Sequence, residues 1–177
     1  MKTTGGQSTV VCLVTAIGLI ARLDAQTQTL ERDSTRVVIE NTQKMAIETA
    51  SKLKGIVYQD QITSFLTATN SQHYFGALFL ETIPAEASYI QGLFTNSLPR
   101  VECGTNSVTI GSNRITDKIS QKPAALFWAH VTSCSARTAE VTAGWYSGPE
   151  SGMKSRYLLN CSGGEWTVTG RTDERIW

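Results

Sequence analysis

The sequence predicts an α+β fold in which an N-terminal helix packs on a curved antiparallel sheet of at least four strands. Two observations lead to this prediction. Residues 35–54 carry apolar side chains at helical spacing, and the last third of the chain contains four strand-length runs separated by short turns. Connections that short favour neighbouring antiparallel strands, because a parallel pair needs a longer crossover.

The first 25 residues have the pattern of an export signal. Lys2 precedes an apolar run at residues 10–21, which ends before Arg22. As a helix, this run would cover about 18 Å of a hydrocarbon core of about 30 Å, so we expect no stable membrane span. Cleavage fits best after Ala25, although Leu23 is a poor match to the small residue that usually stands there. We expect residues 1–25 to be a signal peptide and the protein to be secreted or periplasmic.

The remaining chain has the size of one domain, with residues 26–34 as a flexible lead-in and residues 35–177 as a single α+β domain. Removal of residues 1–25 leaves 14 basic and 14 acidic residues. These charges are scattered and form neither the basic stripe that nucleic acid requires nor the polybasic cluster that binds anionic lipid. No metal-ligand spacing or cofactor fingerprint occurs, so we expect no nucleic-acid partner, no metal and no cofactor.

The helix predicted at residues 35–54 has a charged stripe whose members are four residues apart and alternate in sign. Residues 37–39 are three adjacent β-branched residues, which also fit a short strand. Gly55 predicts a break or a bend, followed by a second helical piece that ends near Ala68. The apolar stripe consists of Ile39, Ala46, Ala50, Leu53 and Val57.

The middle of the chain gives weaker signals. Residues 73–83 are dense in apolar side chains and stop at Pro84, which predicts a buried strand or a short core segment. Residues 85–98 are ambiguous, and residues 99–122 predict a loop with at most one short strand. The four strands of the last third are expected at residues 125–133, 138–146, 155–161 and 166–171.

The last predicted hairpin carries Tyr157 and Leu159, a turn at Gly164, and then Trp166 and Val168. This pattern resembles the final hairpin of cystatin-like or nuclear-transport-factor-two-like α+β cone domains, and of small exported bacterial proteins of unknown role. The resemblance implies a pocket between the sheet and the helix, which in some relatives binds small apolar molecules or supports acid/base chemistry. Others use the same surface for protein contacts, and no catalytic residue is carried over.

His130 is the candidate acid/base residue, because an imidazole titrates near neutral pH. A four-residue turn at residues 134–137 would place His130 opposite Val141, with Glu140 on the other face of the sheet. A register slip of one residue would bring Glu140 to the face of His130 and form an acid/base pair. Asp60 and His73 are further candidates, and for each of these residues an ordinary hydrogen-bonded or exposed position is the alternative.

Trp128, Trp145 and Tyr157 are candidate ligand-binding residues, although aromatic side chains in a small sheet also serve as core. Cys134 and Cys161 fall at the same end of the predicted meander, which favours a disulfide between them. Three free, buried thiols, with Cys103 as the third, are the alternative.

The absence of a catalytic motif favours a non-enzymatic module that binds a small ligand or a protein. The alternative is a small pocket enzyme of polyketide-cyclase-like type that uses His130 as its acid/base. A structural component assembled through an unpaired cysteine is a third hypothesis. A deep pocket lined by His130 and a carboxylate would favour the enzyme, whereas a filled interface between helix and sheet leaves surface binding.

Overall fold

The protein is described by a computed structural model that covers residues 8–69, 74–111, 114–149 and 151–175. The chain divides into two compact units, Met1–Met45 and Ala46–Trp177, and each is described by itself. Helix α1 (Ser8–Thr69) begins in the first unit and ends in the second. The second unit also contains β1 (Ala77–Leu80), α2 (Pro84–Gly92), β2 (Arg100–Cys103), β3 (Val108–Ile110), β4 (Ile115–Asp117), β5 (Ala124–Cys134), β6 (Thr138–Gly148), β7 (Ser151–Ser162) and β8 (Glu165–Arg175).

The first unit is helical from Ser8 onwards. Residues 26–34, for which the polar composition predicts a flexible lead-in, form part of α1, and so do the β-branched residues 37–39. Arg36 and Glu40 form an exposed ion pair at 2.9 Å, which contributes a few tenths of a kcal/mol to the helix. Within the described residues, no helix combines the length and the apolar content needed to cross a membrane.

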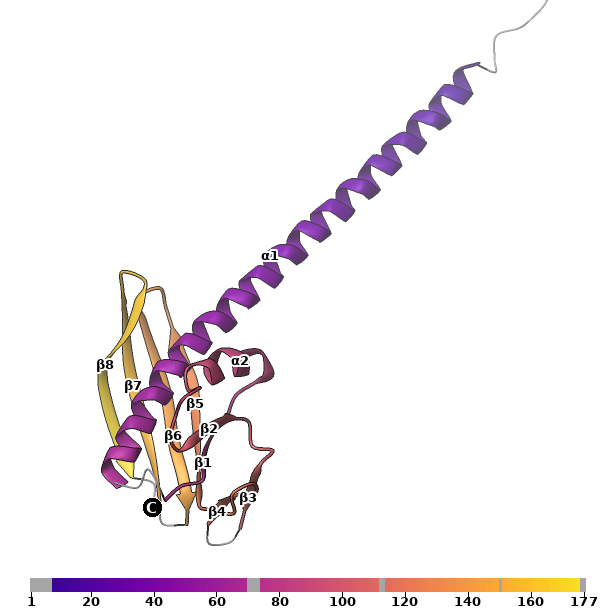
Figure 1. Cartoon of the computed structure of the whole chain (residues 1–177). Helices are drawn as coiled ribbons and strands as arrows, with labels where there is room; N and C mark the ends of the chain where they lie inside the picture. The colour runs from indigo at the N-terminus through magenta and orange to yellow at the C-terminus, as the bar shows by residue number, and fades with distance from the viewer. Residues whose placement is uncertain (1–7, 70–73, 112–113, 150, 176–177) are drawn as a thin grey trace, which may run out of the picture. The chain divides into compact units, whose positions relative to one another are not determined.

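The second unit contains a six-stranded sheet with the order β2-β1-β5-β6-β7-β8 (Figure 1). Strands β5 to β8 pair as an antiparallel meander, which confirms the prediction of four adjacent antiparallel strands covered by an N-terminal helix. Strand β1 pairs in parallel with both β2 and β5. Helix α2 connects β1 to β2 and provides the crossover that a parallel pair requires.

The second half of α1 packs on one face of this sheet, which we call the α1 face. The helix contributes Leu53, Val57 and Phe65 to a core that also contains Phe127 and Val141 from the sheet. Positions 53, 57, 61 and 65 recur every four residues, so they lie on one side of the helix. The interface between helix and sheet is filled by these side chains.

Helix α1 continues through Gly55, so the predicted break is wrong. A Cβ atom at this position would lie 2.6 Å from Cδ1 of Leu93, which follows α2, and glycine therefore allows the two segments to approach closely. Beside it, Nζ of Lys54 donates to both carboxylate oxygens of the buried Glu86 at 2.9 Å and ties α1 to α2.

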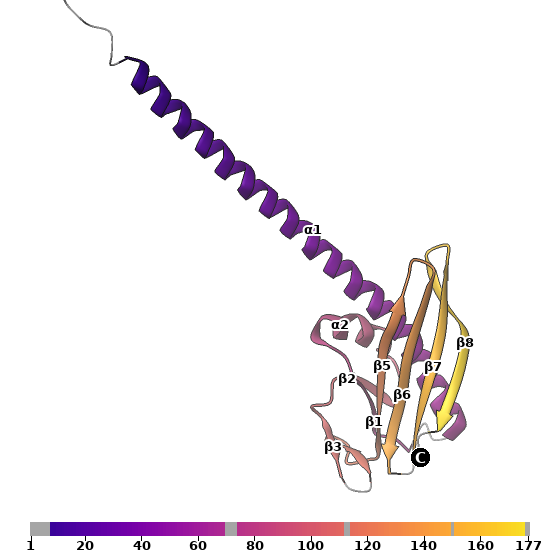
Figure 2. The same ribbon diagram turned by 180° about the vertical axis from the view of Figure 1, so that it is seen from behind.

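Residues 99–122 contain three short strands instead of at most one. Strands β3 and β4 form a hairpin that covers Ala77, Phe79 and Ala124 on the face opposite α1, which we call the outer face (Figure 2). Each of these strands is only three residues long, which is too short for an alternating pattern to show in the sequence.

The two edges of the sheet differ. At the β2 edge, Nε2 of Gln91 donates to the carbonyl of Val101 at 2.8 Å, and the amide of Cys103 donates to Oε1 of Gln91 at 2.9 Å. The side chain of Gln91 thus forms hydrogen bonds with a backbone C=O and a backbone N–H of β2 that a further strand would need for pairing. At the other edge, β8 pairs only with β7 among the described strands.

Candidate functional site

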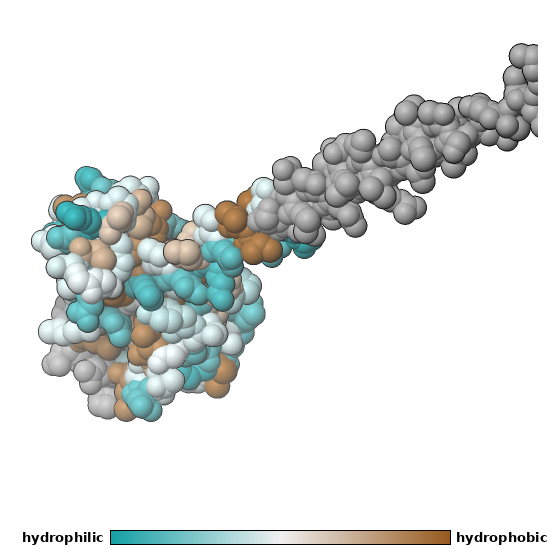
Figure 3. All heavy atoms as spheres, turned by 90° about the horizontal axis from the view of Figure 1, so that it is seen from above, coloured by the Kyte–Doolittle hydropathy of each residue, from teal (hydrophilic) through white to brown (hydrophobic). Residues whose placement is uncertain are grey.

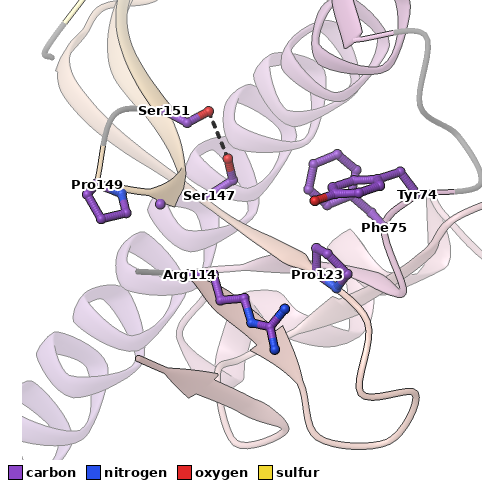
Figure 4. A pocket seen from close by; sticks show the side chains of 8 residues that line it. Tyr74, Phe75, Arg114, Pro123, Ser147, Pro149 and Ser151 are labelled. Atoms are coloured by element: carbon purple, nitrogen blue, oxygen red, sulfur yellow. Dashed lines mark hydrogen bonds between the residues drawn. The ribbon is translucent and has the colours of Figure 1, made fainter. Parts of the chain in front are cut away.

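An open cleft of about 570 Å³ lies at one end of the sheet, where the start of β1, the β3–β4 hairpin and the β6–β7 turn come together. Its volume is within the range of about 300 to 1,000 Å³ that is usual for small-molecule sites. Figure 4 shows Ser147, Pro149 and Ser151 on one side of the cleft, and Tyr74 with Phe75 on the other. The lining residues are Tyr74, Phe75, Arg114, Pro123, Ser147, Gly148, Pro149 and Ser151.

Arg114 carries the only charge among the described residues that line the cleft. Its guanidinium makes no ion pair with any acidic residue in the described parts of the chain, and its side chain is exposed. The backbone carbonyl of Arg114 accepts a hydrogen bond from the amide of Gly111 at 3.0 Å, which fixes the residue just before β4. Among its described residues, the cleft therefore presents one positive charge, held on the β3–β4 hairpin.

The two aromatic side chains of the cleft are held differently. Phe75 is buried and lies 5.0 Å from Phe65 of α1 between ring centroids. Tyr74 is 60% exposed and meets Phe75 edge to face at 5.1 Å. Opposite them, the hydroxyl of Ser147 donates to that of Ser151 at 3.0 Å. The cleft thus combines a fixed apolar wall with a pair of hydroxyl groups that retain free hydrogen-bonding capacity.

His130 and Trp128 lie on the outer face, where their rings stack at 5.4 Å. His130 pairs with Thr142 instead of Val141, so the predicted register is wrong by one residue. Strand β5 continues through Cys134, which shortens the turn, and the extra residue Thr132 forms a bulge. The indole of Trp128 covers Gly144, whose Cβ position would lie 2.5 Å from the ring.

The observed register places Glu140 on the same face as His130, but the two do not pair. Oε2 of Glu140 accepts a hydrogen bond from Arg156 at 2.6 Å, and this bond holds the pKa of the Glu140 carboxyl below its ordinary value. His130 is exposed and is not among the described residues that line the cleft. His73, the other candidate imidazole, lies outside the described residues.

Asp60 and Tyr157 are brought together, under α1. The hydroxyl of Tyr157 donates to Oδ2 of Asp60 at 2.9 Å, and Nη1 of Arg171 donates to the same oxygen at 2.8 Å. Burial raises the pKa of Tyr157, and the bond to Asp60 raises it further, so the hydroxyl stays neutral and acts as a donor. Arg171 also reaches Ser64 of α1 and Asp173 of its own strand. This polar cluster ties α1 to β7 and β8.

The remaining candidates take structural positions. Trp145 lies on the α1 face and packs edge to face on Phe65 at 4.7 Å. Cys103, Cys134 and Cys161 are free thiols. Strand β6 lies between the strands of Cys134 and Cys161, which separates them by about 10 Å, whereas a disulfide needs Cα atoms within about 7 Å. The described residues contain no group of three His, Cys, Asp or Glu side chains placed to hold a metal ion.

Sequence reasoning missed the cleft, because its residues come from four separate segments. Arg114 stands in a stretch that the sequence predicts as loop, and Ser147 and Ser151 flank a predicted turn. No motif links these positions, and only the fold brings them together. Arg171 was missed in the same way, although an arginine within an otherwise uncharged strand pattern is a usable signal for a polar contact inside the fold.

Comparison with protein-family models, with curated proteins and with solved structures finds no match to this chain. The resemblance of the last hairpin to cystatin-like and nuclear-transport-factor-two-like domains therefore stays a prediction. What is shown is an α+β fold, with a long N-terminal helix and a mostly antiparallel six-stranded sheet.

Proposed function

We propose that this protein is a non-enzymatic binding module that holds a small organic anion in the cleft. The observation that carries the proposal is Arg114, whose guanidinium is the only charge among the described residues of the lining and forms no ion pair with any of the described acidic residues. A carboxylate or similar group would receive charge-assisted hydrogen bonds from this side chain. The ring of Tyr74 and the buried Phe75 would contact the apolar part of the ligand.

The filled interface between α1 and the sheet supports surface binding over a deep internal pocket. Figure 3 shows hydrophilic and neutral residues over most of the visible face of the second unit, with hydrophobic residues in small groups. Such scattered apolar residues are ordinary on protein surfaces. The cleft, whose lining includes an arginine, two serine hydroxyls and two aromatic rings, is therefore the better candidate for specific recognition than this face.

The alternative function, an acid/base enzyme that uses His130, requires a carboxylate within hydrogen-bond reach in a cavity. Glu140 on the same face is bound to Arg156 instead, and the imidazole of His130 is stacked on Trp128. These contacts favour the binding module.

We also propose that residues 1–25 direct export, because Lys2 is followed by a short apolar run. Mass spectrometry of the protein purified from its native host tests this proposal, and the first peptide should begin near Gln26.

Titration calorimetry of the purified protein with benzoate tests the anion site, with benzylamine as a probe of the same shape and opposite charge. Benzoate should bind and benzylamine should not. Arg114→Gln should weaken benzoate binding by at least about tenfold, because a hydrogen bond to a charged group contributes about 1.5 to 3 kcal/mol. Arg137→Gln, at an exposed arginine in the β5–β6 turn, is the matched control and should bind as the wild type does. Equal affinities for benzoate and benzylamine would refute the proposal.

A further inference from the structure

Strand β8 is the longer and less protected edge of the sheet. It has 11 residues, against four in β2 at the opposite edge (Figures 1 and 2). The β2 edge is closed by the amide of Gln91, whereas the described residues place no strand or side-chain amide along the free side of β8. An open edge carries a row of N–H and C=O groups that no strand pairs with, and such a row is a template for pairing with another extended backbone.

A bulge divides β8 into two halves with different character. Leu158 pairs with Gly170 and Leu159 pairs with Val168, so Thr169 is the extra residue. The second half carries Arg171, Asp173, Glu174 and Arg175, and charges of this kind keep other strands away. The first half, residues 165–169, contains a single charge, on Glu165. The charges that protect an edge are therefore concentrated in the second half.

The first half has an amphipathic arrangement. Trp166 and Val168 lie on the α1 face, where they pack against the core but remain partly exposed. Thr167 pairs with Asn160, and it is exposed on the outer face. A strand added at this edge would bury more of the indole of Trp166 and of the side chain of Val168, while Thr167 would stay in contact with water.

We propose that the first half of β8 pairs, antiparallel, with the same segment of a second copy of this chain, about a two-fold axis at Thr167. In this register Trp166 faces Val168 of the other copy and Val168 faces its Trp166, both on the α1 face. Aromatic and β-branched side chains form favourable cross-strand pairs. Thr167 faces Thr167, and Glu165 faces Thr169, so no like charges meet. An axis at Thr172 would instead place Arg171 opposite Asp173 of the other copy, although both side chains already have partners within their own chain.

The ladder is short, and the interface belongs to the small, transient class. The pairing is therefore measured by trapping it covalently. Opposite residues of an antiparallel pair have Cα atoms about 4.5 to 5.5 Å apart, within the range of a disulfide. A residue on the two-fold axis faces itself, so a single cysteine there links two copies.

The test introduces one cysteine at a time into the full-length chain, by Thr167→Cys, Thr172→Cys or Thr142→Cys. All three threonines lie on the outer face, and Thr142 is on the central strand β6, where no new strand can pair. After mild oxidation, peptide mass spectrometry counts the disulfide that joins residue 167 to residue 167 and separates it from links through the native cysteines.

Thr167→Cys should give at least about tenfold more self-linked dimer than Thr142→Cys, with Thr172→Cys at the level of the control. Equal yields at residues 167 and 142 would overturn the proposal, and so would linkage through residue 172, because the protected half would then be the one that pairs. Circular dichroism of each variant confirms that the sheet is intact.

Discussion

Gln61 is a polar side chain enclosed by the core without a partner. It is 1% exposed, and neither its amide nitrogen nor its carbonyl oxygen has a hydrogen-bond partner among the described residues. The residue stands four positions after Val57 and eight after Leu53, both fully buried, on the side of α1 that faces the sheet. We predict that Gln61→Met stabilises the protein.

The magnitude follows from the two unpaired groups. A buried polar group without a hydrogen bond costs about 1 to 3 kcal/mol, and part of this cost is relieved by small adjustments of the neighbours. Methionine has nearly the same length and shape and brings no polar hydrogen to be satisfied. We expect the free energy of unfolding to rise by about 2 kcal/mol.

Urea denaturation followed by far-UV circular dichroism measures this change. With an m value of about 2 kcal/mol/M, the midpoint should rise by about 1 M, and m itself should stay unchanged. Gln59→Met, at an exposed glutamine of the same helix, is the matched control and should alter stability by less than about 0.5 kcal/mol. A midpoint for Gln61→Met at or below that of the wild type would show that the amide is satisfied in solution and refute the reasoning.

Three further changes have defined outcomes. Tyr157→Phe removes the hydrogen bond to Asp60 and should lower the free energy of unfolding by about 1 to 2 kcal/mol in the same urea assay. Gly144→Ala places a Cβ atom 2.5 Å from the indole of Trp128 and 2.6 Å from the carbonyl of Met153, and this overpacking should cost about 1 to 3 kcal/mol. Burial raises the pKa of Asp117, but hydrogen bonds from Ser120 and the charge of Arg100 outweigh it, so the pKa lies below its ordinary value. A carboxylate whose pKa is depressed in the folded state stabilises the protein above about pH 4, and this stabilisation is lost as the pH falls through the pKa of the folded state. Asp117→Asn should therefore lower the free energy of unfolding at pH 7. The difference in stability between this variant and the wild type should shrink in acid.

Each of these changes has a control in the same chain. Tyr89→Phe, at an exposed tyrosine of α2, should leave stability unchanged. Gly92→Ala meets no atom within 4 Å at the end of α2 and should be neutral or stabilising by about 0.5 kcal/mol. Glu165→Gln, the control for Asp117→Asn, removes an exposed carboxylate and should leave the free energy of unfolding unchanged both at pH 7 and in acid. A loss in Gly92→Ala as large as that in Gly144→Ala would remove the steric explanation for the latter.

The meander could be predicted because its strands are long and each has one buried face. In β7, the buried residues Ser155, Tyr157 and Leu159 alternate with the exposed residues Arg156 and Leu158. Alternation over that length, ended by glycine and serine turns, is a local property of the sequence. The same locality explains why the helix that covers the sheet could be predicted.

The middle of the fold could not be predicted because it depends on distant partners. Strand β2 exists through its parallel pairing with β1, and the pairing is made possible by α2. Gly55 does not break α1, and its lack of a Cβ atom allows the close approach of Leu93, 38 residues further along the chain. The register of His130 depends on the bulge at Thr132, where the sequence has no glycine to mark it.

The candidate site could not be predicted from the sequence either, because it also depends on contacts between distant segments. Tyr74 and Arg114 meet in one cleft only after β1 has joined the sheet and the β3–β4 hairpin has folded back. The residues that did stand out, Trp145 and Tyr157, did so because of their size, and they contribute to the packing under α1.

The glutamine that closes the β2 edge also limits how far the protein assembles. A sheet with two open borders can recruit copies at both sides and extend into a fibre. The side chain of Gln91 bonds the backbone at one border as a neighbouring strand would, which blocks the addition of a strand there, and the proposed two-fold contact at β8 would use up the other border in each copy. Association of this kind stops at two chains, and loss of this single amide would make polymerisation possible.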